Sequence, residues 1–264
     1  MIQNYYRALD EADALALKKE HSQALFLAGG TQINRENLYW KMPESVIDIR
    51  DALSKKIVKE EMEVVIGAMA ALQDVADSGA VPPALREAAA FIPTRSIRNQ
   101  ASIGGNIGAA RPDSYIIPTL IVLSAILNTS QGRLQIEEYL EQGSSELIYD
   151  IRLPKLPLSA VAVKESRSHI APPVVSAAVS LRRNGSESLH ARVALGCVAS
   201  KTLRLRRVEQ GLESGELRAR EDIERAVKAA IRPKSDILGS AEYKTYINSA
   251  TVADAALRCL EGLS

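Results

Sequence analysis

The sequence of 264 residues contains only two cysteines and few aromatic side chains. Cys197 and Cys259 fit no zinc, iron–sulfur or redox spacing, so no metal site is predicted. So few cysteines favour a reducing compartment, and residues 1–7 lack the basic and apolar segments of a signal peptide. We therefore expect a cytoplasmic protein. Aromatic residues make up 4% of the chain, which predicts a core built mainly from Ala, Leu, Ile and Val.

The chain also lacks a charge excess and a long apolar run. The formal net charge is +1, which argues against a protein that binds nucleic acid electrostatically. The longest apolar run, from Ile116 to Leu127, is interrupted by Pro118, Thr119 and Ser124 and is too short to cross a bilayer. Neither a nucleic acid nor a membrane is an expected partner.

The periodicity of apolar residues predicts a mixed α and β protein with a boundary at Leu153-Pro154-Lys155-Leu156-Pro157. Before the boundary, short strands and helices intermingle, and residues 95–106 are expected to form an ordered loop. After it, strands come first and helices follow, with a hairpin turn expected at Asn184-Gly185. We divide the chain at this point into residues 1–156 and 157–264.

Two glycine pairs are the main candidates for a binding site. Ala28-Gly29-Gly30-Thr31-Gln32 follows a predicted apolar strand, and Ser102-Ile103-Gly104-Gly105-Asn106 lies in the predicted loop. Backbone N–H groups in such turns can bind a phosphate, and glycine permits the dihedral angles that this requires. Either pair alone is more typical of an ordinary tight turn. Neither is a G-x-G-x-x-G or Walker A motif, so the site is expected to be neither Rossmann-type nor P-loop.

Taken together, the two motifs resemble those of the FAD-binding (medium) subunits of molybdenum hydroxylases, the xanthine dehydrogenase and carbon monoxide dehydrogenase flavoprotein family. There the motifs read approximately A-G-G-[HST] and [ST]-[IV]-G-G-N. Leu195-Gly196-Cys197-Val198-Ala199 and Ser240-Ala241-Glu242-Tyr243-Lys244 are similar to signatures of the family's C-terminal domain. The resemblance implies an α+β fold. It consists of a two-lobed PCMH-type FAD-binding domain at 1–156 and a smaller α+β, carbon monoxide dehydrogenase flavoprotein-like domain at 157–264.

The resemblance also implies which residues contact FAD. The residues that would hold the pyrophosphate and nearby atoms are Leu27, Ala28, Gly29, Gly30, Thr31, Gln32, Ile33, Ser102, Ile103, Gly104, Gly105 and Asn106. Ile92 falls where relatives contact the adenine, and Ile148 and Lys164 fall at positions that contact the flavin end. No residue is assigned a catalytic role or a metal.

Three positions depart from the family pattern. Tyr115 stands where many relatives have Asp, His169-Ile170 replaces an Asp-Ile or Asp-Phe pair, and Arg111 replaces a small residue. The first two motivate an alternative, a scaffold or assembly protein of this family that has lost FAD.

The leading hypothesis is an electron-transfer subunit of a xanthine dehydrogenase-like oxidoreductase. By the resemblance, electrons from a molybdopterin-binding large subunit would pass through a [2Fe-2S] small subunit to FAD, and then to NAD or another acceptor. A third hypothesis, a free-standing flavin oxidase, would need catalytic acids or bases, and the C-terminal segment shows none.

Overall fold

The computed structural model describes residues 2–33, 42–143, 146–184 and 188–263. The chain forms two compact units. Unit 1 comprises Met1–Val81, Thr94–Ala109 and Ala125–Leu153, and unit 2 comprises Pro82–Pro93, Ala110–Ser124 and Pro154–Ser264. The chain thus passes from unit 1 into unit 2 three times. The last passage follows Leu153, at the predicted proline-rich boundary. The division into domains 1–156 and 157–264 stays a prediction.

Unit 1 contains two sheets. The smaller sheet is parallel, in the order β1 (Asn4–Arg7), β3 (Ser45–Asp48) and β2 (Leu25–Leu27), and α1 (Glu11–Glu20) follows β1. The larger sheet has the order β4 (Ile57–Lys59), β5 (Glu63–Gly67), β8 (Ile148–Pro154), β6 (Ile126–Thr129) and β7 (Gly132–Gln135). The remaining helices of this unit are α2 (Leu72–Asp77), α4 (Arg95–Gln100), α5 (Ile103–Gly108) and α7 (Ile136–Gln142).

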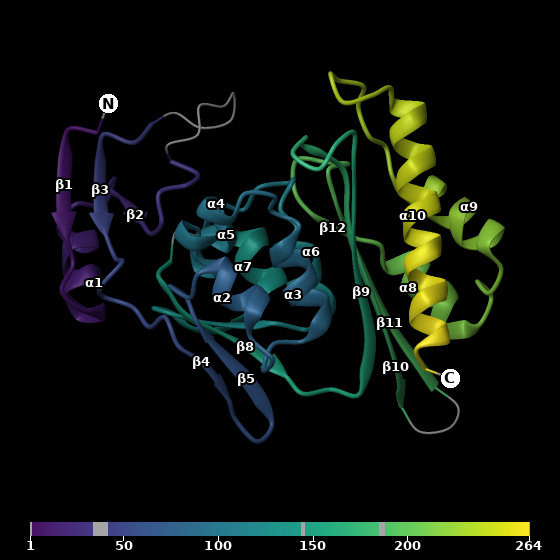
Figure 1. The fold of residues 1–264 in the computed structure, drawn as a ribbon, viewed down its shortest axis with the longest axis horizontal. Helices are drawn as coiled ribbons and strands as arrows, with labels where there is room; N and C mark the ends of the chain where they lie inside the picture. Colours follow the sequence, from purple (N-terminus) through teal and green to yellow (C-terminus); the bar gives the residue numbers. More distant parts are fainter. Residues whose placement is uncertain (1, 34–41, 144–145, 185–187, 264) are drawn as a thin grey trace. The chain divides into compact units, whose positions relative to one another are not determined.

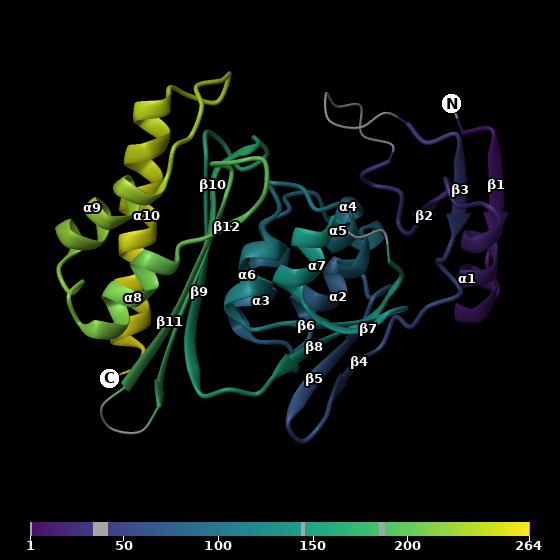
Figure 2. The same ribbon diagram turned by 180° about the vertical axis from the view of Figure 1, so that it is seen from behind.

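Unit 2 is built around an antiparallel sheet with helices on both faces (Figures 1 and 2). The strand order is β12 (Leu203–Arg204), β11 (Ser188–Gly196), β10 (Pro173–Asn184) and β9 (Leu158–Ser166). One face packs against α8 (Arg206–Ser214) and α10 (Ala241–Glu261), with α9 (Arg220–Ala230) against α10. The other face packs against α3 (Pro83–Ala90) and α6 (Ile116–Val122).

Alternation along β10 explains how this sheet is covered on both faces. Val175, Val179 and Leu181 belong to the apolar core shared with the C-terminal helices. The serines between them point to the opposite face, where Ser176 Oγ donates to the Ser114 carbonyl at 2.7 Å. Successive side chains in a strand point to opposite faces. Val175, Val179 and Leu181 therefore face the C-terminal helices, and the serines between them face the opposite side of the sheet.

The α+β class is confirmed, and most predicted elements are present within a few residues of their expected ends. Strands β10 and β11 pair antiparallel up to Asn184 and Ser188, as a hairpin requires, although Gly185 lies outside the described residues. The expectation of a loop over residues 95–106 is wrong, because helices α4 and α5 form there. The short strands β1 and β4 were not predicted, since mostly exposed residues give them no apolar pattern. Among the described helices, none combines the length and the apolar character that crossing a bilayer requires.

Candidate functional site

The structure brings the two predicted glycine motifs together within unit 1. We call residues 28–33, which follow β2, the first glycine turn, and residues 102–106, which begin α5, the second glycine turn. A Cβ atom on Gly105 would lie 3.2 Å from the Cβ of Ala28. A Cβ on Gly29 would overlap the backbone carbonyl of Gln100, at the end of α4. Glycine at 29 therefore allows the first turn to pack directly on the protein backbone.

The second glycine turn is the N-terminus of a short helix, and its amide groups are already hydrogen-bonded. The donors and acceptors are Ile103 N–H to the Ala70 carbonyl (3.0 Å), Gly104 N–H to the Ala68 carbonyl (2.9 Å), and Gly105 N–H to Ser102 Oγ (3.1 Å). Ser102 is thus the N-cap of α5. A Cβ on Gly104 would lie 2.7 Å from the Cβ of Ala68, so close packing requires glycine there.

The first glycine turn has the opposite character. No backbone N–H from Gly29 to Ile33 donates to another described residue. Gly30 has φ of +70°, a left-handed conformation that glycine adopts at little cost. The side-chain oxygen of Gln32 is buried and has no hydrogen-bond partner among the described residues. A run of available amides beside an unpartnered polar group suits the pyrophosphate and adjoining atoms of FAD.

The strand that pairs with β2, just before the first glycine turn, carries a buried carboxylate. Leu27 pairs with Asp48, and its carbonyl accepts the N–H of Ile49 at 3.0 Å. Asp48 is 3% exposed and accepts hydrogen bonds from Arg50 and from the Tyr5 hydroxyl. Burial alone would raise the pKa of Asp48, but the hydrogen bonds from Arg50 and Tyr5 outweigh it and lower the pKa to about 2. Asp48 therefore stays ionised.

Three predicted FAD contacts lie outside the two glycine turns in the sequence. Ile148 begins β8 in unit 1 and is 5% exposed, so its side chain belongs largely to the core. Ile92 follows α3 and Lys164 lies on β9, and both belong to unit 2. The assignment of these three residues to FAD stays a prediction.

Lys164 is surrounded by neutral partners. Its Nζ donates to the carbonyls of His169 at 2.9 Å and Phe91 at 3.2 Å. The same atom lies 5.4 Å from the centroid of the Tyr115 ring, whose edge meets Phe91. Burial lowers the pKa of Lys164. Two of the departures from the family pattern, Tyr115 and His169, are therefore direct neighbours of Lys164.

The third departure, Arg111, forms an ion pair in the same unit. Its Nε and Nη2 donate to the two carboxylate oxygens of Asp113, both at 2.8 Å. The following loop is attached to the sheet through the N–H of Cys197, which donates to the Pro112 carbonyl at 2.8 Å. Arg111 thus has a structural role within unit 2.

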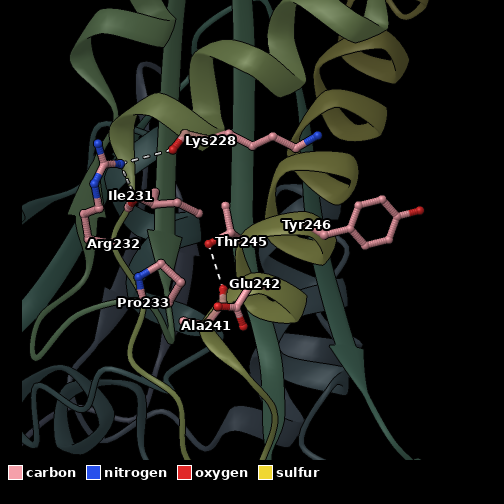
Figure 3. Close-up of a pocket in the computed structure, with 8 residues that line it drawn as sticks. All are labelled: Lys228, Ile231, Arg232, Pro233, Ala241, Glu242, Thr245 and Tyr246. Atoms are coloured by element: carbon pink, nitrogen blue, oxygen red, sulfur yellow. Dashed lines mark hydrogen bonds between the residues drawn. The ribbon is translucent and has the colours of Figure 1, made fainter.

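A hollow of about 520 Å³ lies between the end of α9 and the start of α10 (Figure 3). The two positively charged side chains that line it, Arg232 and Lys228, already bind other groups of the protein. Arg232 Nη1 donates to the carbonyls of Ile231 at 2.6 Å and Ala229 at 3.0 Å. Lys228 Nζ lies 3.3 Å from a carboxylate oxygen of Glu224 and near the Tyr246 ring. The hollow therefore offers no convergent set of available polar groups, and we assign it no function.

Neither cysteine is suited to redox chemistry. Burial raises the pKa of the Cys197 thiol to about 12 and that of Cys259 to about 11, so both stay protonated at neutral pH. In the described part of the chain, no three His, Cys, Asp or Glu side chains gather into a group that could hold a metal ion.

Sequence reasoning missed the residues that support the two glycine turns. Ala68 and Ala70 accept its N–H groups through their backbone carbonyls, and the carbonyl of Gln100 packs against Gly29. Backbone atoms carry no side-chain signature. The run of small residues in Gly67-Ala68-Met69-Ala70-Ala71 was the available signal, because small side chains permit close approach of two backbones.

Comparisons with known proteins agree with this geometry. Residues 1–156 match the FAD binding domain in molybdopterin dehydrogenase, and residues 162–258 match the CO dehydrogenase flavoprotein C-terminal domain. The chain is 36% identical to protein YgfM of Escherichia coli (strain K12), over 98% of this chain and 97% of that protein. It is 30% identical to the carbon monoxide dehydrogenase medium chain of Hydrogenophaga pseudoflava, over 90% of each.

Solved structures give the same result. The chain resembles a chain of the carbon monoxide dehydrogenase from Hydrogenophaga pseudoflava that lacks the Mo-pyranopterin moiety of its cofactor. The TM-score is 0.86 at 28% identity, and the match covers 99% of this chain and 98% of that one. The resemblance noted in the motifs is confirmed: this chain belongs to the family of FAD-binding medium subunits of molybdenum hydroxylases, is an oxidoreductase subunit, and has FAD as its cofactor.

Proposed function

We propose that this chain carries electrons within a molybdenum hydroxylase, from the iron–sulfur clusters of a partner subunit through FAD to NAD or another acceptor. The observation that carries the proposal is the first glycine turn, whose amides from Gly29 to Ile33 donate to no described residue, while the turn packs against α4 and α5. FAD, when bound, supplies reversible two-electron and one-electron chemistry. The chain supplies binding, orientation and electrostatics.

The proposed roles differ between the two units. In unit 1, the amides of the first glycine turn bind the pyrophosphate, and the second glycine turn holds that loop in shape. In unit 2, Lys164 provides positive charge for the flavin end, because its ammonium group has carbonyl and aromatic neighbours and no carboxylate partner among the described residues. Ile92 at the adenine and Ile148 at the flavin end complete the proposed set.

The proposed partners are a molybdopterin-binding large subunit and a [2Fe-2S] small subunit. A [2Fe-2S] cluster is held by four ligands, usually cysteine thiolates, and this chain has two cysteines, both of raised pKa. The clusters that exchange electrons with the flavin must therefore lie on another chain. Both cysteines are free, which fits the proposed cytoplasmic location.

Co-purification from the native source, with an affinity tag on this chain, tests the proposal. We expect the tagged chain to bring down two further subunits, and we expect the complex to contain molybdenum, iron and one FAD per tagged chain. NADH, or a reduced alternative acceptor, should bleach the flavin absorbance of this complex under anaerobic conditions. Reduction by the substrate of the large subunit should bleach the same band.

Two results would contradict the proposal. A chain recovered alone and colourless, which then binds no FAD in a titration, would point to a scaffold that has lost its flavin. A chain that alone consumes oxygen with a small-molecule substrate would point to a free-standing flavin oxidase.

A further inference from the structure

The side chain of Gln32 poses a chemical problem within the first glycine turn. Its carboxamide oxygen, Oε1, is buried and accepts no hydrogen bond from any described residue. A buried acceptor without a donor destabilises the folded protein, because it has lost its hydrogen bonds to water. Such groups are uncommon in folded proteins, and this one belongs to a residue of a turn whose amide groups also have no described partner.

The pyrophosphate cannot satisfy this oxygen. At neutral pH its oxygens are acceptors, and two acceptors do not form a hydrogen bond. The neighbouring N–H groups of the turn suit those phosphate oxygens, whereas Oε1 of Gln32 needs an O–H or N–H donor. In FAD, the donors closest to the pyrophosphate are hydroxyl groups, which occur on the ribityl chain on one side and on the adenosine ribose on the other.

We propose that Gln32 is a specificity-determining residue whose Oε1 accepts a hydrogen bond from a hydroxyl of the sugar or sugar alcohol attached to the pyrophosphate. The inference rests on the proposed binding of the pyrophosphate by the first glycine turn. In this proposal Gln32 contacts a hydroxyl of the organic part of the ligand, and the backbone amides bind the phosphate. A simple anion would engage the amides and leave Gln32 unsatisfied.

The substitution Gln32→Met tests this role in the full chain freed of flavin. Methionine keeps the length of the side chain and removes the acceptor. The Kd for FAD should rise about fivefold to tenfold, which corresponds to one neutral hydrogen bond. The Kd for inorganic pyrophosphate, measured by competition with FAD, should not change. The apo-protein should melt at a higher temperature than the wild type, because a buried unsatisfied acceptor has been removed.

Two further ligands identify the hydroxyl. FMN carries the ribityl chain without the ribose, and ADP carries the ribose without the ribityl chain. A loss of affinity for FAD and FMN, with ADP unchanged, assigns the ribityl chain, and a loss for FAD and ADP, with FMN unchanged, assigns the ribose. Gln3→Met serves as a matched control, since Gln3 is an exposed glutamine of the same unit, and it should alter none of these values.

Three results would overturn the inference while wild-type binding of FAD stands. These are an unchanged Kd for FAD, an equal loss of affinity for FAD and inorganic pyrophosphate, and a lower melting temperature of the Gln32→Met apo-protein. The second would show that Gln32 donates to phosphate, and the third that Oε1 has a partner within the protein. Failure of the wild-type chain to bind FAD would instead contradict the proposed function.

Discussion

The two glycine turns look alike in the sequence and differ in the structure. Gly29-Gly30 lies in a loop whose amide groups have no described partner, whereas Gly104-Gly105 begins a helix whose first amide groups are all used by the protein. Glycine also serves different purposes in them. Gly30 adopts a left-handed conformation, and Gly29 and Gly104 make room for neighbouring backbone. The same glycine pair can therefore form a loop in one place and begin a helix in another. Its repetition does not by itself indicate two equal phosphate contacts.

Gly29→Ala should have the largest effect. The new methyl group would overlap the carbonyl of Gln100, which is backbone and cannot rotate away. Overpacking of this kind costs about 1–3 kcal/mol and occasionally more, and here we expect at least the upper end. Urea unfolding should show the loss of stability, and fluorescence titration should show no FAD binding. Gly108→Ala is the control, because its Cβ would meet no atom within 4 Å. Normal stability and FAD affinity in Gly29→Ala would contradict the packing of the two turns.

Gly104→Ala should separate stability from affinity. Its Cβ would press on the Cβ and the carbonyl of Ala68, at 2.7 and 2.8 Å, so the second glycine turn must shift. We expect a loss of about 1–3 kcal/mol in the free energy of unfolding. The folded fraction should still bind FAD with less than about a tenfold loss, because the amides of this turn are not available to the ligand. A much larger loss of FAD affinity at unchanged stability would show that the second turn contacts the pyrophosphate directly.

Acid should weaken the small parallel sheet that precedes the first glycine turn. The pKa of Asp48 is about 2 in the folded protein, below the value of about 3.9 in unfolded chains. The stability that Asp48 contributes is therefore fully present above about pH 4 and is lost as the pH falls towards 2. Asp48→Asn should lower the free energy of unfolding by about 1–2 kcal/mol at pH 7, after allowance for the partly exposed Arg50, and should flatten the acid dependence.

Unfolding by urea at a series of pH values from 7 to 2 measures this dependence. The second glycine turn, residues 102–106, contains no ionisable side chain, so its variants should follow the acid profile of the wild type. An acid profile of Asp48→Asn identical to that of the wild type would show that another carboxylate is responsible.

Ser102→Ala should have the smallest effect. It removes the hydroxyl that accepts the Gly105 N–H, and the loss of an N-cap costs about 1 kcal/mol. FAD affinity should change by less than about threefold, since the cap supports the helix and not the ligand. Thermal unfolding with and without FAD measures both quantities. A loss of FAD affinity greater than that of Gly104→Ala would assign the Ser102 hydroxyl to the cofactor.

Much of the fold was accessible from the sequence because each element depends on local patterns. The alternation along Val174 to Leu181 predicted β10, and the prolines at 82 and 83 predicted the start of α3. The loop expected over residues 95–106 was wrong for a tertiary reason. Ser102 caps α5 while the carbonyls of Ala68 and Ala70 accept the N–H groups of Ile103 and Gly104, and those two residues lie more than thirty positions away.

The candidate site also has features that local sequence patterns predict and features that depend on tertiary contacts. Sequence alone determined that two glycine motifs exist and that their order and spacing resemble one family, because both properties are read directly along the chain. The resemblance then implied FAD as the cofactor. Only the tertiary structure decided which motif keeps its amide groups available, and that Gln32 holds a buried oxygen without a described partner. Hydrogen-bond satisfaction depends on what lies nearby in space, and distant segments supply those partners when the chain folds.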